Sequence, residues 1–287
     1  MPRLSDIQGR IASMGELLSI VGAMRSLAGM RVQEAQRALP GIRRYAGAME
    51  AGIAGALMLM ERQAPGLPAR DGRRVLIVCM AEHGFVAGFN ERIAEAAEAE
   101  LKQRDLLFVV GSRGTSLLFE RGREAAWTEP MATRLAAAPA TAERLAKELY
   151  ARIARGEVAR VEVMFGRHRQ GRQPAMERRL LLPLDAATLG KGRTRQAPLS
   201  NLKPEALFEK LAAEYVFALL TEACVESIAS ENAARFAAMQ SACDNVSKKL
   251  EQLQGQARQA RQEEITTELV DLVTGCEAMR GRGLLPG

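Results

Sequence analysis

The chain has 287 residues, of which 47% are hydrophobic, and its 40 Lys and Arg against 34 Asp and Glu give a net charge of +6. This composition excludes a mainly disordered chain and can supply the core of one large domain or two smaller ones. Only 4% of the residues are aromatic, and alanine and leucine abound, which favours long helices packed through small residues. The positive charge fits an acidic partner, either nucleic acid, a membrane surface or protein.

The cysteines and apolar runs exclude further classes. Cys79, Cys224, Cys243 and Cys276 are far apart and the chain has only two histidines, so the ligand spacing of a zinc site is missing and no metal or other cofactor is expected. We expect reduced thiols packed as small apolar residues in a cytoplasmic protein. The N-terminus lacks the regions of a signal peptide, and the apolar run at 51–60 is too short to span a bilayer. A soluble or peripheral chain is therefore expected.

Residues 1–60 are predicted to form a first long helical segment. One apolar stripe consists of Leu4, Ile7, Ile11, Met14, Leu18 and Val21, and a second beside it consists of Leu17, Ile20, Met24 and Leu27. Together the stripes predict a wide apolar face. Pro40 and Gly41 are predicted to kink or end the helix, with a second helical piece to about residue 60.

Three glycines recur at heptad spacing in this segment, at Gly15, Gly22 and Gly29. Each costs roughly 0.5–1 kcal/mol relative to alanine inside a helix. We therefore predict a close approach of a neighbouring backbone along this edge. The alternative is plain tolerance of glycine in a helix held by tertiary packing.

Between residues 72 and 190, strand and helix patterns alternate. The strand candidates are 74–80, 106–110, 158–165 and 178–184, and the helix candidates are 89–103, 113–122 and 140–155. The alternation predicts a small parallel α/β sheet. The turn-rich stretch 168–174 separates the last two strands and predicts an antiparallel hairpin.

The turn AEHGFVAGFN at 81–90 raises the question of a phosphate site, because it follows a buried strand and opens a helix. It matches neither the dinucleotide fingerprint nor the P-loop, and the second turn, VVGSRG at 109–114, is equally ordinary. We interpret these glycines as shaping strand-to-helix turns. Since no Ser, His or paired carboxylates stand in a catalytic pattern, an enzyme is not expected.

Basic residues gather near the end of this region. They are Arg167, Arg169, Arg172, Arg178, Arg179, Lys191, Arg193 and Arg195. They could contact phosphates, but no aromatic residues lie between them to stack on bases. A solvated hairpin face or an acidic protein partner is the favoured interpretation.

Residues 203–281 are predicted to form a second long helix. Steps of three and four residues join Phe208, Leu211, Tyr215, Ala218, Glu222, Val225, Ala229, Asn232, Phe236, Met239, Cys243, Val246, Leu250, Leu253, Ala257 and Ala260. This pattern predicts a coiled-coil seam about 80 Å long. After Ala260 the series shifts to Ile265, Leu269, Leu272, Cys276 and Met279, so the seam turns to a new face. The predicted fold class is α+α/β: a long two-helix hairpin with arms from opposite ends of the chain and an inserted α/β domain.

Both ends of the chain resemble a known family. IQGRIASM and IVGAMRSLAGMR (20–31), with ESIASENAARFAAMQSACDN (226–245) and RQEEITTELVDLVTGCEA (261–278), resemble the first and last helices of the gamma subunit of F-type rotary ATP synthases. AEHGFVAGFN falls where the family carries a turn similar to SDRGLCGGFN. The resemblance implies an antiparallel coiled coil with an inserted Rossmann-like domain that is not a catalytic nucleotide site.

The resemblance also implies a function. It implies a non-catalytic central rotor shaft that couples transmembrane ion flow to ATP synthesis or hydrolysis at the beta subunits. The implied partners are the alpha and beta subunits, the epsilon subunit and the c-subunit ring, with no nucleic acid, and the implied location is the cytoplasmic face of the bacterial inner membrane. Met24 matches the methionine of the family's AM pair, and Arg261, Gln262 and Thr266 match residues that engage beta-subunit catch loops.

The chain also departs from the family. RQARQ at 258–262 replaces NRARQ, Cys243 replaces a common threonine, and Cys276 follows Gly275 where the family has alanine. In the turn, Ala81, Glu82, His83, Val86 and Ala87 replace the typical residues. These departures favour the hypothesis of the alternate F-type ATPase found as a second system in some bacteria, for which sodium is a candidate coupling ion beside the proton. Two other classes stay open at this point: a coiled-coil scaffold that dimerises, and a dinucleotide-binding oxidoreductase.

Overall fold

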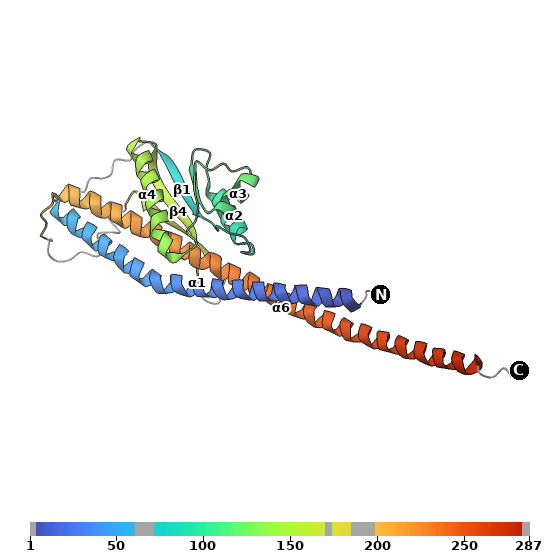
Figure 1. Cartoon of the computed structure of the whole chain (residues 1–287). Helices are drawn as coiled ribbons and strands as arrows, with labels where there is room; N and C mark the ends of the chain where they lie inside the picture. The colour runs from blue at the N-terminus through green and yellow to red at the C-terminus, as the bar shows by residue number, and fades with distance from the viewer. Residues whose placement is uncertain (1–3, 61–71, 170–173, 185–198, 283–287) are drawn as a thin grey trace. The chain divides into compact units, whose positions relative to one another are not determined.

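The computed structural model describes residues 4–60, 72–169, 174–184 and 199–282 (Figure 1). The chain begins with helix α1 (Leu4–Leu59) and ends with helix α6 (Pro204–Arg282), and the α/β elements lie between them in sequence. It divides into two compact units. One unit comprises residues 26–238, and the other comprises the two helix ends, residues 1–25 and 239–287.

The larger unit is built around a five-stranded sheet of order β3-β2-β1-β4-β5. Its strands are β1 (Arg73–Cys79), β2 (Leu106–Val110), β3 (Trp127–Glu129), β4 (Val158–Arg167) and β5 (Ala175–Leu182). β1 pairs in parallel with β2 and β4, β2 pairs in parallel with β3, and β5 is antiparallel to β4. The parallel sheet and the terminal hairpin predicted from the sequence are thus confirmed. The short, partly exposed strand β3 was not predicted.

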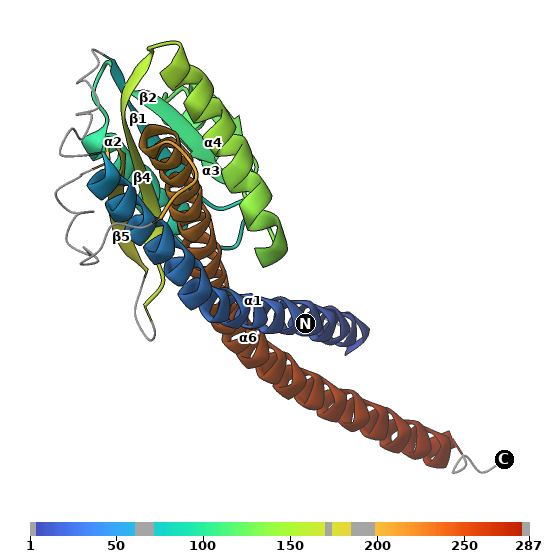
Figure 2. The same cartoon turned by 90° about the vertical axis from the view of Figure 1, so that its left-hand side faces the viewer.

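Helices cover both faces of the sheet. α2 (Phe89–Glu100) and α3 (Ser112–Glu120) pack on the face that carries Leu76 and Val78. α4 (Ala138–Ala154), which follows the short helix η1 (Leu135–Ala137), packs with α6 on the face that carries Val75 and Ile77, as Figure 2 shows. Because side chains from both faces of β1 are covered from Val75 onward, the sequence from Val75 to Cys79 is a continuous apolar run.

Helix α1 continues through Pro40, so of the two predicted outcomes the end of the helix is wrong, while a kink at Pro40 stays a prediction. A proline in a helix interior removes one hydrogen bond and costs roughly 3 kcal/mol. Tertiary packing holds the helix on both sides, since Ala35, Leu39 and Ala46 are buried in the core of the larger unit. Pro40 itself points to solvent.

Within the larger unit, the predicted seam of α6 is buried at Ala218, Val225 and Ala229, and Glu222 and Asn232 are buried too. The Asn232 amide donates to the Ile228 carbonyl at 2.8 Å and its oxygen accepts from Arg235 at 3.1 Å, so this polar residue is satisfied inside the seam. Phe236 departs from the prediction, because it is exposed.

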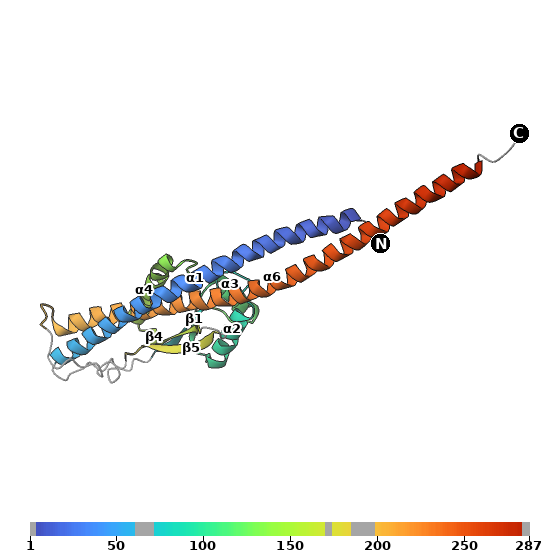
Figure 3. The ribbon, with the colours of Figure 1, turned by 90° about the horizontal axis from the view of Figure 1, so that it is seen from below.

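The smaller unit consists of the paired ends of α1 and α6, which run antiparallel, as the positions of the two termini in Figure 3 show. Arg25 donates to Gln240 at 3.0 Å, while Ile7, near the start of α1, lines the same groove as Ala260. Ile7 and Val21 from α1 are buried, as are Met239, Cys243 and Leu253 from α6. The coiled coil with arms from opposite ends of the chain is confirmed.

The seam changes face after Ala260 because the pairing ends there. α1 begins at Leu4, and the side chains of α6 from residue 261 to residue 276 are all exposed. The displaced apolar series that starts at Ile265 therefore has no α1 residues to pack against in the described part of the chain.

Of the two stripes on α1, only the first is buried. Ile7 and Val21 are buried and the rest of their stripe is half-buried, whereas Leu17, Ile20 and Leu27 are exposed. The predicted wide apolar face exists, but the chain itself covers one side of it.

The glycine prediction fails at two of three positions. A Cβ placed at Gly15 or Gly22 would meet no described heavy atom within 4 Å, so no backbone approaches closely there. At Gly29 it would lie 3.3 Å from the ring of Phe236, which is a side-chain contact. Tolerance in a helix held by packing explains the first two glycines better.

We expect Gly15→Ala to stabilise the isolated chain by about 0.5–1 kcal/mol, because alanine has less freedom to lose on folding and meets no neighbour. Urea unfolding followed by circular dichroism measures the change. Gly29→Ala is the matched control, and we expect a smaller gain or a loss from its contact with Phe236. Equal gains at both positions would show that the Phe236 contact carries no energetic weight.

Candidate functional site

The turn at 81–90 adopts a left-handed backbone over much of its length. Phe85 has φ 61°, Ala87 φ 34° and Gly88 φ 65°. The side-chain oxygen of Asn90 accepts from the Ala81 backbone at 2.9 Å and ties the two ends of the turn together. Gly88 thus supplies the conformation that glycine favours, while Phe85 and Ala87 adopt it at a steric cost.

Glu82 places its carboxylate at the N-terminus of α3. Its carboxylate accepts from the Ser112 backbone at 3.0 Å, from the Ser112 hydroxyl at 2.7 Å and from the Met131 backbone at 2.8 Å. Ser112 is the first residue of α3, and the N–H groups of a helix N-terminus are the usual phosphate ligands. The chain's own carboxylate occupies this position.

The environment keeps Glu82 ionised. Burial by itself raises the pKa of Glu82, but the hydrogen bonds from Ser112 and Met131 outweigh burial, and the net pKa lies below the ordinary 4.5. A stable carboxylate at the α3 N-terminus repels an incoming phosphate, which agrees with the interpretation of these turns as structural.

The second glycine turn packs α3 on β1. A Cβ at Gly111 would lie 2.4 Å from the Met80 carbonyl oxygen, and one at Gly114 would lie 2.2 Å from the Met80 Cβ. Both glycines are therefore required by close packing. Gly84 has no such neighbour within 4 Å and no positive φ, so neither reason applies to it.

The arginines of the hairpin pair mainly within the chain. Arg178 pairs with Glu100 and Arg179 pairs with Glu177 at 2.7 Å and Glu222 at 2.6 Å. Their acidic partners are thus intramolecular, and the expected acidic protein partner is not needed to explain them. Arg167 also pairs within the chain, with Glu177 at 2.8 Å. Arg172, Lys191, Arg193 and Arg195 lie outside the described residues.

Three of the four cysteines follow the prediction. Cys79, Cys224 and Cys243 are buried free thiols, whereas Cys276 is exposed near the end of α6. A hydrogen bond with Cys224 and burial raise the pKa of the Cys79 thiol well above its ordinary value. Cys79 therefore stays protonated and packs as a small apolar residue.

The end of α6 carries the largest continuous exposed apolar series that the described residues show. Its members are Ile265, Leu269, Val270, Leu272 and Val273. Exposed apolar surface of this extent on a folded chain indicates a binding surface.

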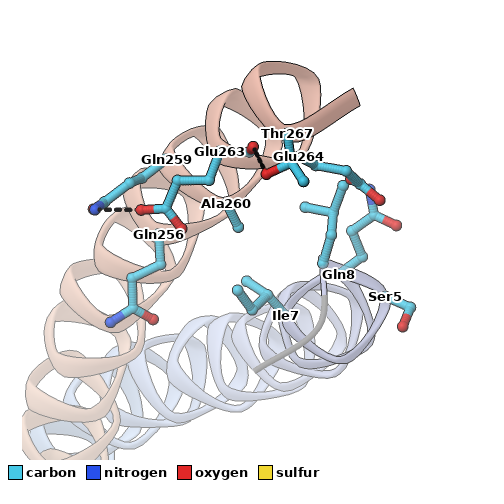
Figure 4. A pocket seen from close by; sticks show the side chains of 10 residues that line it. Ser5, Ile7, Gln8, Gln256, Gln259, Ala260, Glu263, Glu264 and Thr267 are labelled. Carbon is cyan, nitrogen blue, oxygen red and sulfur yellow. Dashed lines mark hydrogen bonds between the residues drawn. The ribbon is translucent and has the colours of Figure 1, made fainter. Parts of the chain in front are cut away.

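An open groove lies where the smaller unit's helices part (Figure 4). Leu4, Ile7 and Ala260 form its apolar part, and glutamine and glutamate side chains line the rest. The Gln259 amide donates to Glu263 at 3.1 Å within α6. No catalytic arrangement converges here, and we interpret the groove as the open end of the coiled coil.

Helix α1 is also long and apolar enough, by length and composition, to cross a membrane. This observation is weak alone, because helices of soluble proteins can pass the same test. Only 11% of the most apolar 18-residue stretch of α1 is buried within the chain, so most of its side chains are uncovered. The window includes part of a coiled-coil helix, so another protein can cover it as well as lipid can.

The residues predicted to contact a beta subunit lie at two levels of the coiled coil. Arg261, Gln262 and Thr266 fall within two turns of α6 and are all exposed, and the Thr266 hydroxyl donates to the Gln262 carbonyl at 2.7 Å. Met24 is half-buried on α1, next to Arg25, which contacts Gln240. The 21 residues from Gln240 to Arg261 span roughly 30 Å of helix, so the structure groups three of the four residues.

A sequence model described as ATP synthase matches residues 3–279. The chain belongs to the ATP synthase family. Among its relatives, the ATP synthase gamma chain of Anaeromyxobacter sp. (strain K) is 29% identical over 98% of this chain and 100% of the relative. The ATP synthase gamma chain of Paracoccus denitrificans (strain Pd 1222) is 28% identical over 97% of this chain and 100% of the relative.

Solved structures of ATP synthases share the fold. A chain of the Tetrahymena thermophila mitochondrial central stalk and c-ring structure matches 78% of this chain and 99% of its own length, with a TM-score of 0.57 and 18% identity. A chain of the Euglena gracilis mitochondrial OSCP/F1/c-ring structure matches 93% of this chain and 98% of its own, with a TM-score of 0.53 and 12% identity.

The expected resemblance to the ATP synthase gamma subunit is confirmed by these relatives over nearly the full chain. The chain is a non-catalytic subunit with the role of a central rotor shaft, and the scaffold and oxidoreductase alternatives are set aside. Sequence reasoning missed the hydrogen bonds of Glu82. The signal that could have revealed these hydrogen bonds is that Glu82 replaces the residue typical of the family in this turn.

We expect Glu82→Gln to destabilise the chain by roughly 1–2 kcal/mol at neutral pH, because an amide replaces a charged acceptor of three hydrogen bonds. A carboxyl whose folded pKa is lowered stabilises above its unfolded pKa, and this stabilisation is lost as pH falls below 4.5 through the folded pKa. Urea unfolding across this window should therefore show less pH dependence in the variant. An unchanged pH dependence would contradict the role assigned to Glu82.

Proposed function

We propose that this chain couples transmembrane ion flow to ATP synthesis or hydrolysis as the rotating shaft of an F-type ATP synthase at the cytoplasmic face of a bacterial inner membrane. Its partners are the alpha and beta subunits around the shaft, and the epsilon subunit and the c-subunit ring near the inserted domain. Residues 1–60 and 203–281 form the shaft in this proposal, and residues 72–190 form the inserted domain.

The observation that carries the proposal is the unpaired end of α6. From residue 261 to residue 276 the helix is exposed on every side, and its apolar residues include Ile265, Leu269 and Leu272. Burying one such side chain contributes about 1.5–3 kcal/mol. A ring of subunits around the helix can cover these apolar side chains on every side. A rotating helix requires such a ring, because a strong contact on one fixed side would stop rotation.

The shaft acts through its asymmetry. Two helices pair over one length and a single helix continues beyond them, so each surrounding subunit meets a different surface at any moment. Each part of the shaft surface favours the conformation of a beta subunit that contacts it best. When the shaft turns, that part of its surface faces the next beta subunit and favours the same conformation there. No chemistry is required of the shaft itself.

We further propose that Met24, Arg261, Gln262 and Thr266 contact the beta subunits. The last three are exposed on α6, and the Arg261 guanidinium forms no ion pair with the described residues, so it can donate to a carboxylate on another chain. Met24 offers a half-buried apolar contact on α1. The two levels agree with beta-subunit contacts at more than one height.

A finer proposal concerns the ion. The departures from the family in the turn and at Cys243 and Cys276 favour the alternate form, which makes sodium a candidate coupling ion beside the proton. The c-subunit ring selects the ion, so its carboxylate ligands test this point. A c-subunit ring without sodium-type carboxylate ligands would exclude sodium as the coupling ion.

The shaft role predicts that Ile265→Ser with Leu269→Ser weakens assembly with alpha and beta subunits on the order of 100-fold or more, since two buried apolar contacts are lost. The isolated chain should keep its stability, because both side chains are already exposed in it. Titrating the variant into alpha and beta subunits, with ATPase activity as the readout, measures the effect. Phe119→Ser on α3 removes an equally exposed apolar side chain and should assemble normally; unchanged assembly of the double variant would refute the proposed burial.

The contact proposal predicts that Arg261→Gln with Gln262→Ala lowers the ATPase rate of the assembled complex several-fold and leaves unfolding of the isolated chain unchanged. Both side chains are exposed, so their loss acts only through a partner. Arg113→Gln is the control, because Arg113 is an exposed arginine on α3 in the inserted domain, outside the end of α6 that the ring of subunits surrounds. Equal rates in the variant and the control would remove these residues from the contact.

A further inference from the structure

A buried carboxylate joins three elements of the larger unit. One oxygen of Glu222 on α6 accepts from Arg43 of α1 at 2.8 Å, and the other accepts from Arg179 of β5 at 2.6 Å. The Glu222 side chain is only 6% exposed. Burial by itself raises the pKa of Glu222, but hydrogen bonds from Arg179 and Arg43 outweigh burial and lower it, so the side chain stays ionised.

A second carboxylate one helical turn further on repeats this connection. Glu226 accepts from the other end of the Arg43 guanidinium and from the His168 backbone at 3.3 Å, and Arg167 of β4 lies 4.0 Å away. Arg43 thus holds two successive turns of α6 with one planar group. Such a two-point contact fixes the rotation of α1 against α6 as well as their separation.

Glu177 closes the set into a ring. It accepts from Arg179 at 2.7 Å and from Arg167 at 2.8 Å, which links the two strands of the hairpin. The ring therefore consists of three arginines and three glutamates from α1, α6, β4 and β5. We call it the junction ring: Arg43, Arg167, Arg179, Glu177, Glu222 and Glu226.

Polar contacts continue along the same helix. The Ser227 hydroxyl donates to the Cys79 carbonyl at 3.2 Å and the Ser230 hydroxyl donates to the Gly166 carbonyl at 2.6 Å. Arg235, paired with Glu231 at 2.6 Å, donates to the Gly84 carbonyl at 3.3 Å. α6 is therefore attached to the ends of β1 and β4 by directional bonds as well as by apolar packing.

Net stability does not explain this design. Buried ion pairs contribute little to stability compared with apolar groups of the same size, because desolvation offsets their attraction. They do restrict geometry, whereas apolar contact is non-directional and resists sliding weakly. A junction that must transmit twist between a domain and a helix pair requires resistance to sliding.

We propose that the junction ring is the joint through which torque passes between the inserted α/β domain and the shaft helices, with Glu222 as its central positioning residue. This inference rests on the proposed function. Glu222 touches α1 and β5 together, so removing its charge breaks the direct ionic link between β5 and the helix pair while the apolar core remains.

The test is Arg179→Met with Glu222→Met in the complete ATP synthase in membrane vesicles. The change removes the α6–β5 ion pair, yet leaves Arg43 with Glu226 and Glu177 with Arg167, so the remaining charges keep a partner. ATP hydrolysis is measured together with membrane potential from a potential-sensitive dye, which responds to either ion. We expect hydrolysis close to that of wild type and a fall of about fivefold or more in the potential generated per ATP.

The control is Arg144→Met with Glu129→Met, which removes an exposed ion pair between α4 and β3 without touching α6. This control should generate the same potential per ATP as wild type. Glu222→Gln keeps the side-chain volume and is tested instead if the double variant does not assemble. If an assembled Glu222 variant generates the wild-type potential per ATP, the junction ring is not the joint, but the proposed function stands. If the wild-type complex generates no potential, the proposed function itself is refuted.

Discussion

The burial of the middle of α6 is the constraint on which the other features depend. From Ala218 to Asn232 every residue of the helix is buried, because the sheet, α4 and α1 surround it. A helix buried on all sides is normally apolar all round, yet this one carries several charged and hydroxyl side chains. Each buried polar group must then find a partner. The partners lie on the sheet and on α1, so the same segment is both the core of the larger unit and a continuation of the coiled coil.

The long helices could be predicted because their signal is local and repeated. Heptad spacing identified both arms, and strand and helix alternation identified the parallel sheet and its hairpin. The predicted helix end at Pro40 and the predicted close approach at Gly15 failed because the local cost of each residue is visible in the sequence. The packing that outweighs that cost, or the open space that makes it harmless, is not visible there. β3 was missed because three partly exposed residues carry no periodicity.

The candidate functional residues were harder to predict than the fold. Arg261, Gln262 and Thr266 came only from the resemblance, since exposed polar residues on a helix have no pattern of their own. Glu82 meets Ser112 and Met131, and Glu222 meets Arg43 from the far end of the chain. The sequence did show Glu222 as a charged residue in an apolar seam, but a seam position does not indicate which distant arginines will surround it.

The solitary end of α6 has a consequence for how the protein matures. A single helix without tertiary packing is only marginally stable in water, and its apolar side chains offer a surface for self-association. The last turns therefore gain stability only when partner subunits bind them, and this gain grows with partner concentration. A cell that makes this chain in excess of its partners should accumulate a species whose C-terminal end is open to proteases. Quality control can thus match the number of shafts to the number of rings.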